Sequence, residues 1–264
     1  MCRWATRGRS SEKSALNWAP RCVPSNSGSP DESSPPMTQV AIDGPASSGK
    51  SSVGSRVAAE LGFGFLDTGL LYRAVTCAAI DAGNSLDQAE SGGRWTDDRI
   101  ESIVALAFRT RVDIERGGAA ISVDSRRFAA GELESEAVER TVATVAALAD
   151  VRAALRTVQR DAAMRGGIVL AGRDIGTVVY PEARHKFYLD ASPEARARRR
   201  ALQRGYEIGS SEHRDALNGL LARDREDRTR AAAPLRAADD ARIIMTDDLS
   251  LADVVETIVR EVRP

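Results

Sequence analysis

Residues 40–73, VAIDGPASSGKSSVGSRVAAELGFGFLDTGLLYR, decide the fold of this chain. A short apolar run leads into glycine and small residues, and apolar side chains then recur at helical spacing as far as Leu61. Residues 44–51 match the pattern G-x-x-x-x-G-K-[ST] at every constrained position. The stretch therefore predicts a phosphate-binding loop between a buried strand at 40–43 and a helix at 50–61.

The residue types of this loop suit the binding of ATP. Gly44 and Gly49 allow backbone angles that a Cβ would forbid, so main-chain N–H groups can surround phosphate oxygens. We expect Lys50 to reach the β- and γ-phosphates and the Ser51 hydroxyl to ligate Mg²⁺. The predicted nucleotide-binding residues are Gly44, Pro45, Ala46, Ser47, Ser48, Gly49, Lys50, Ser51 and Ser52. The structural alternative, a glycine turn that only caps a helix, is disfavoured by the flanking strand and helix.

Composition narrows the class of protein. The 264 residues are 42% hydrophobic, which is enough for a buried core, and no apolar run approaches the roughly 18 residues of a membrane span. A net charge of −1 gives no basic field, so we expect neither a nucleic-acid nor a membrane partner. The three cysteines lack C-x-x-C spacing and the chain has two histidines, which supports neither a disulfide framework nor a zinc site. We therefore predict a cytoplasmic protein.

Residues 1–36 differ in composition from the rest of the chain. They are rich in Ser, Pro, Gly and Arg without apolar periodicity, which predicts a disordered N-terminal extension before a domain at 37–264. An organelle transit peptide is the alternative, disfavoured by Glu12, Asp31 and Glu32. We hypothesise that Met37 is the natural start. A purified chain beginning at Met37 should then keep full activity in a steady-state assay, and loss of activity would contradict the hypothesis.

The pattern after the loop predicts an α/β fold. Further strands are expected at 63–67, 167–170, 186–190 and 243–246, with an arginine-rich helical region at 193–230 and a helix at 249–262. The alternation at 108–114 and 120–123, around Gly117 and Gly118, predicts an antiparallel hairpin. A helical segment at 134–164, interrupted near Asp150, follows it. Because such a hairpin does not belong in a doubly wound parallel sheet, we assign it to an insertion.

Charged residues at two strand ends are candidates for a site. Arg173 and Asp174 follow the apolar strand at 167–170, where charges are costly without ionic partners. Arg73 is expected in the first two turns of the helix after 63–67, also near a strand end. The alternatives are a local Arg173–Asp174 turn and a solvent-facing helix arginine.

The arginine-rich region holds a third set of candidates. Arg223, Asp227 and Arg230 are spaced i, i+4 and i+7, which predicts that they share one face of a helix. Two cations around one anion can hold a phosphate and a sugar hydroxyl. The alternative is a solvated arginine-rich face.

From Thr38 onward the chain resembles the bacterial cytidylate kinases. The motifs IDGPASSGKSS, LDTGLLYRAV, VAALADVRAAL, GRDIGTVVYPEA, ASPEARARRR and RDREDRTRAAAPLRAADDA occur in the order and spacing of that family. The resemblance implies a P-loop kinase core at 37–105 and 165–264 with a doubly wound parallel sheet, a small α+β CMP-binding insertion at about 106–164 and an arginine-rich lid at about 196–230. It implies phosphorylation of CMP and dCMP by ATP with Mg²⁺. We expect a monomer.

The resemblance also implies roles in phosphoryl transfer. Arg73, Arg173 and Arg230 would hold the acceptor phosphate by motif position. Lys50, Arg173 and Arg230 would be the catalytic residues, because the nucleophile is already anionic and charge neutralisation matters more than a general base.

Recognition of the nucleoside is implied for four other residues. Asp227, steadied by Arg223, would accept from the ribose, and Arg152 and Asp174 would meet the cytosine. The N4 amino group of cytosine is a donor, which suits a carboxylate, and its O2 and N3 are acceptors, which suit arginine. UMP replaces that donor by an acceptor, so Asp174 should disfavour UMP.

Some positions depart from the pattern of the family. Ala143, beside Thr144, stands where a base-reading serine is usual, so we expect CMP to be preferred over UMP with looser discrimination than the family shows. Glu134, Ala171 and Met245 are the other departures. None of them lies in the phosphate loop or among the phosphate-binding arginines.

Two other functions stay open from the residues alone. The first is a P-loop kinase of another small acceptor, such as shikimate or dTMP. The second is a nucleic-acid-binding ATPase that uses the arginine-rich region as its contact surface, although the carboxylates within RDREDRTR and the net charge disfavour it.

Overall fold

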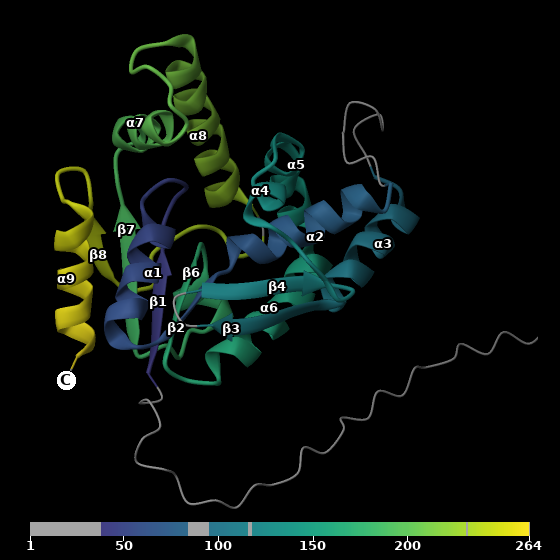
Figure 1. Cartoon of the computed structure of the whole chain (residues 1–264), viewed down its shortest axis with the longest axis horizontal. Helices are drawn as coiled ribbons and strands as arrows, with labels where there is room; N and C mark the ends of the chain where they lie inside the picture. The colour runs from purple at the N-terminus through teal and green to yellow at the C-terminus, as the bar shows by residue number, and fades with distance from the viewer. Residues whose placement is uncertain (1–37, 84–94, 116–117, 231, 264) are drawn as a thin grey trace, which may run out of the picture. The chain divides into compact units, whose positions relative to one another are not determined.

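A parallel sheet carries the fold of the described residues. Its five strands lie in the order β2-β6-β1-β7-β8, all parallel, with β1 (Gln39–Asp43) at the centre (Figure 1). The other strands are β2 (Gly64–Asp67), β6 (Ile168–Gly172), β7 (His185–Asp190) and β8 (Arg242–Met245). Every residue of β1 and β6 is buried, as parallel strands covered on both faces require. The predicted α/β fold is confirmed.

The computed structural model describes residues 38–83, 95–115, 118–230 and 232–263. These belong to one compact unit, Pro35–Pro264. The predictions made for residues 1–36 and for Gly117 lie outside the described residues. The division of 37–264 into core, insertion and lid stays a prediction.

The two faces of the sheet are covered by different helices, as a doubly wound sheet requires. Val40 and Ile42 point into an apolar cluster with α1 (Lys50–Leu61) and α9 (Leu251–Val262), which pack against each other. Ala41 points to the opposite face, into a cluster with α2 (Gly69–Asp81), α3 (Asp97–Phe108) and other helices. Alternate side chains of one strand therefore divide the core in two.

The predicted hairpin is present, with one correction. Strands β3 (Thr110–Glu115) and β4 (Gly118–Val123) pair antiparallel, and a short β5 (Arg126–Arg127) extends them to a three-stranded sheet. Phe108, which was placed in the first strand, instead ends α3, because the backbone N–H of Arg109 bonds back to Leu106 and closes the helix. The alternation begins only at Thr110.

The helical segment before β6 is interrupted as predicted. Its helices are α5 (Glu136–Ala147) and α6 (Ala149–Ala163), and a short α4 (Ala130–Leu133) precedes them. Leu148 is extended (ψ 119°) and separates α5 from α6 two residues before Asp150. A single π-helical turn, η1 (Ile175–Val179), follows β6 and was not predicted.

The arginine-rich region forms two helices, α7 (Pro193–Gln203) and α8 (Ser211–Thr229). The Ser192 hydroxyl caps α7 by accepting from the N–H of Ala195 at 3.2 Å. Arg230 does not continue the helix face of Arg223 and Asp227. Its backbone is extended (ψ 139°), because the chain turns back here and the Leu235 N–H reaches the Asp227 carbonyl at 2.7 Å. Within the described residues, no helix has the length and apolar character needed to cross a membrane.

Candidate functional site

The phosphate loop connects β1 to α1, as predicted. Gly44 has φ 149°, and a Cβ on it would lie 2.1 Å from the carbonyl oxygen of Leu189 on β7. Gly49 precedes the helix at φ 97°, a conformation that favours glycine. Both glycines of the motif are therefore required by the backbone that forms the loop.

Lys50 begins α1 and bends over the loop. Its Nζ donates to the Pro45 carbonyl at 2.5 Å and lies 3.3 Å from the Ser48 hydroxyl. The side chain is buried. Burial, and next the nearby charge of Arg173, lower the pKa of Lys50 well below its ordinary value. An anion bound at this point would favour the charged lysine and offset the cost of its burial.

Ser51 is joined to a carboxylate that the sequence did not single out. Its hydroxyl donates to Oδ2 of Asp67 at 2.5 Å, and Oδ1 of Asp67 accepts from the Gly69 N–H at 2.9 Å. Asp67 ends β2, two strands away from β1. The signal in the sequence is the Asp-Thr-Gly turn at the end of the strand expected at 63–67. A hydroxyl and a carboxylate are hard oxygen ligands of the kind that Mg²⁺ binds.

Arg173, Asp227 and Arg230 form a charged cluster at the end of β6. The Arg173 Nε lies 3.0 Å from Oδ2 of Asp227, and the Arg230 Nη1 lies 3.2 Å from Oδ1 of the same carboxylate. Burial alone would raise the pKa of Asp227, but Arg173, Arg223 and Arg230 outweigh it and lower that pKa. The Nη2 of Arg230 is buried and has no hydrogen-bond partner among the described residues. The cluster thus keeps an unused cationic donor.

Arg223 and Arg73 add positive charge near this cluster. Burial, then the neighbouring Arg173, lower the pKa of Arg223 to about 10. Burial also lowers the pKa of Arg73, whose Nη1 donates to the Leu133 carbonyl at 2.9 Å. Several cations that repel one another in this way form a region suited to anionic groups.

Arg152 and Asp174 form a second pair. The Arg152 Nη2 lies 2.6 Å from Oδ2 of Asp174, and their side chains are 11% and 9% exposed. The guanidinium of Arg152 lies over the ring of Tyr72, 5.5 Å from its centre. The pair therefore combines a donor, an acceptor and an aromatic ring beside one another.

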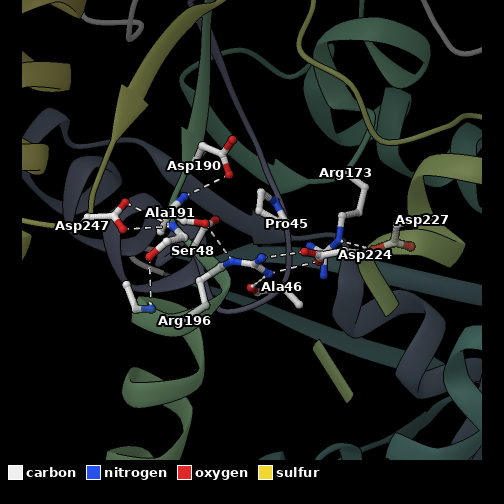
Figure 2. Close-up of polar contacts among 12 residues, drawn as sticks. Pro45, Ala46, Ser48, Arg173, Asp190, Ala191, Arg196, Asp224, Asp227 and Asp247 are labelled. Carbon is white, nitrogen blue, oxygen red and sulfur yellow. Dashed lines mark hydrogen bonds and ion pairs between the residues drawn. The ribbon is translucent and has the colours of Figure 1, made fainter. Parts of the chain in front are cut away.

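The predicted residues share one cleft of about 1120 Å³. Its lining includes Ala46, Ser47, Ser48, Gly49, Lys50, Ser51, Ser52, Arg73, Arg152, Arg173, Asp174, Arg223, Asp227 and Arg230. Gly44 and Pro45, which were also predicted to bind the nucleotide, do not line the cleft. Figure 2 shows Arg173 and Asp227 joined beside the loop residues Pro45 and Ala46. Residues from distant parts of the chain thus meet around one space.

Asp43 joins the phosphate loop to the turn that carries Arg173 and Asp174. It ends β1, and its two carboxylate oxygens accept the N–H groups of Ile175 and Gly176, each at 2.8 Å. Burial raises the pKa of Asp43 from 3.8 to about 6, against the opposing effect of these two N–H bonds. Sequence reasoning missed its role because the bonded partners lie more than 130 residues away.

Asp43 should therefore affect the pH dependence of stability. The folded chain binds the Asp43 proton more tightly than the unfolded chain, so the stability gained from protonated Asp43 is full below pH 3.8 and is lost as the pH rises to about 6. The loss amounts to about 3 kcal/mol. Urea unfolding of the wild type and of Asp43→Asn at pH 4 and pH 6.5 measures it. Between pH 4 and pH 6.5 the free energy of unfolding of the wild type should fall relative to that of Asp43→Asn. If the difference in free energy between the two proteins were the same at both pH values, the raised pKa of Asp43 would be contradicted.

The whole sequence and the fold were compared with those of known proteins. The sequence profile described as cytidylate kinase matches residues 40–264. The chain belongs to the cytidylate kinase family. Cytidylate kinases from Pelotomaculum thermopropionicum and Cereibacter sphaeroides are 41% and 39% identical to it, each over 84% of this chain and over 95% and 94% of the relative. A shikimate kinase structure from Bacteroides thetaiotaomicron is 12% identical, with a TM-score of 0.41, over 85% of this chain and 96% of that one.

Membership of the cytidylate kinase family confirms the resemblance stated from the motifs. The match begins at Val40, at the first strand, and extends to the C-terminus. It therefore includes the phosphate loop, the Arg173–Asp174 turn and both arginine-rich helices. The family does not by itself assign a role to any single side chain of this site.

Proposed function

We infer that this protein transfers the γ-phosphoryl group of ATP to CMP and dCMP. The observation that carries the proposal is one cleft in which a phosphate loop faces a cluster of arginines from three distant segments. A kinase of nucleoside monophosphates needs two anion sites that face each other, one for each nucleotide. Membership of the cytidylate kinase family supports the choice of acceptor.

The donor side is formed by the phosphate loop. The main-chain N–H groups of residues 46–52 and the N-terminus of α1 would hold the phosphates of ATP, and Lys50 would exchange its bond to Pro45 for phosphate oxygens. Ser51 and Asp67 fit Mg²⁺, which would neutralise charge between the phosphates. The Ser51 hydroxyl and the Asp67 carboxylate would be the groups of this chain that hold the ion.

The acceptor side is formed by arginines. Arg73, Arg173 and Arg230 would bind the phosphate of CMP, and the unpaired Nη2 of Arg230 is a donor ready for it. Asp227, held by Arg173 and assisted by Arg223, would accept from the ribose hydroxyls. Because the acceptor phosphate is already an anion, catalysis would come from alignment and charge neutralisation by Lys50, Arg173 and Arg230.

The Arg152–Asp174 pair would read the base. Cytosine presents an N4–H₂ donor to a carboxylate and O2 and N3 acceptors to a guanidinium, and the pair offers both groups 2.6 Å apart. Ala143 and Thr144 also line the cleft. Since alanine offers no hydroxyl to the base, we expect UMP to be phosphorylated more readily than is usual in the family.

Steady-state kinetics with a panel of acceptors tests the proposal. Coupled release of ADP should be strong with CMP and dCMP and weaker with UMP and AMP. Strong turnover of shikimate or dTMP with none of CMP or dCMP would overturn it. ATPase activity stimulated by single-stranded RNA, with salt-dependent binding of that RNA, would support the nucleic-acid alternative instead.

Asp174→Asn tests the reading of the base. The change adds an amide donor beside the N4 amino group, so the ratio of kcat/KM for CMP to that for UMP should fall roughly 10-fold. The exposed Asp161→Asn on α6 is the matched control and should keep the wild-type ratio. An unchanged ratio in Asp174→Asn would show that this carboxylate does not read the base.

A further inference from the structure

Arg196 is a buried arginine outside the predicted site. It lies on α7 and is 2% exposed, and it ranks among the largest fully buried side chains of the described residues. Its Nη1 and Nη2 bond both oxygens of Asp224 on α8, at 3.0 and 2.6 Å. Its Nε donates to the Ala191 carbonyl at 3.0 Å, and Nη1 also reaches the Ala46 carbonyl at 3.2 Å (Figure 2). One guanidinium thus joins three segments of the chain.

The contact with Ala46 bears on the phosphate loop. The peptide between Ala46 and Ser47 is trans and planar, so its C=O and its N–H point in opposite directions. When Arg196 binds the carbonyl, it fixes the N–H of Ser47 on the other side. Ser47 lines the cleft and has φ 58°, a conformation that residues with a side chain rarely adopt. The loop therefore needs an external group to hold this peptide, and Arg196 supplies it.

The contact with Asp224 bears on the acceptor side. Asp224 is buried on α8, and its neighbour Arg223 and the next-turn residue Asp227 both line the cleft. Asp227 binds Arg173 at the end of β6. A displacement of α8 relative to the loop would therefore move the acceptor cluster relative to the donor phosphates.

Stability alone does not account for an ion pair at this place. Ala46, Ala197 and Leu220 form an apolar cluster between the loop, α7 and α8. Buried ion pairs are often replaced by apolar side chains with no loss of stability, because desolvation offsets their attraction. What an apolar pair could not do is bind the Ala46 carbonyl and fix the direction of its peptide.

We propose that Arg196, with Asp224, is a positioning residue for phosphoryl transfer. It sets the orientation of the Ala46–Ser47 peptide, which faces the donor phosphates, and holds α8 and its acceptor residues at a fixed distance from that loop. The proposal rests on the phosphoryl transfer inferred above and adds a residue that does not touch either nucleotide.

The test separates positioning from stability by replacing the pair with apolar side chains. The full chain is compared with Arg196→Met, with the double variant Arg196→Met/Asp224→Leu, and with the exposed Arg198→Met on the same helix as the matched control. Each protein is measured for its thermal midpoint, its kcat and KM for ATP and CMP, and its binding of ADP by calorimetry. Arg196→Met leaves Asp224 buried without a partner, so it should lose both stability and activity.

The double variant decides between the two roles. Positioning predicts a thermal midpoint near that of the wild type together with a kcat/KM lower by about 10- to 100-fold, a raised KM for ATP and weaker binding of ADP. Recovery of the midpoint and of wild-type kcat/KM together would overturn the proposal. If the double variant does not fold, Arg196→Lys decides. Lysine keeps the charge opposite Asp224 but cannot bind both carboxylate oxygens and the Ala46 carbonyl in the same geometry, and wild-type kcat/KM in Arg196→Lys would overturn the proposal.

The wild-type assay keeps this test independent of the proposed function. A wild-type protein that does not phosphorylate CMP would contradict the function itself. A wild type that is active, with a double variant equally active, would contradict only the role of Arg196.

Discussion

Replacement of Lys50 by alanine is expected to lower kcat for CMP by roughly 10²- to 10³-fold, which is the effect of removing one preorganised donor from a phosphoryl-transfer site. Lys50 is buried, and burial lowers its pKa, so the fold gains little from its charge. Its loss should therefore leave the thermal midpoint within a few degrees of the wild type. Single-turnover measurements at saturating ATP and CMP separate the chemical step from product release.

Lys186 provides a control for this experiment. It is a shielded lysine on β7 whose Nζ pairs with Asp240 at 2.7 Å, and it does not line the cleft. Lys186→Ala should keep kcat close to the wild-type value. Equal losses of kcat in Lys50→Ala and Lys186→Ala would show that the effect comes from general destabilisation and would refute the role assigned to Lys50.

Arg173→Ala should weaken CMP far more than ATP. Arg173 would bind the acceptor phosphate and also orients Asp227, at 3.0 Å, toward the ribose, so its removal affects two contacts with one nucleotide. Charge-assisted hydrogen bonds of this kind correspond to roughly 10- to 100-fold in affinity. Calorimetry with CMP, and separately with a non-hydrolysable ATP analogue, measures the two effects.

The matched control for Arg173 is an arginine of α8 that does not line the cleft. Arg225 lies exposed on α8, two residues before Asp227. Arg225→Ala should bind both nucleotides as the wild type does. If Arg173→Ala lowered the affinities for ATP and for CMP to the same degree, Arg173 would lie between the two nucleotide sites rather than on the acceptor side.

Local signals made much of the fold predictable. The phosphate loop depends on glycines whose backbone angles are a property of a few adjacent residues, and α1 begins at Lys50 and ends at Leu61 as predicted. The break between α5 and α6 and the Ser192 cap of α7 are local in the same sense. The positions of the parallel strands were also predictable to within two residues, because buried parallel strands are short apolar runs.

Contacts between distant segments were less predictable. The Ser51–Asp67 bond depends on the neighbouring strand order β2-β6-β1, which no local pattern encodes. Arg230 leaves the helix because of a turn completed by Leu235, and a spacing of i+7 carries no information about that turn. Arg196 looks like any arginine of a solvated helix until the loop and α8 are seen to enclose it.

The pairing of β1 with β6 has a consequence for the spacing of the two phosphate sites. Asp43 lies opposite Gly172 in the sheet, so the donor loop starts from one strand and Arg173 from its hydrogen-bonded neighbour. Adjacent strands keep a nearly constant spacing of roughly 4.8 Å, whatever the helices around them do. Under the proposed function, both phosphate sites are therefore anchored to neighbouring strands of one sheet, and their spacing should persist when the surrounding helices move.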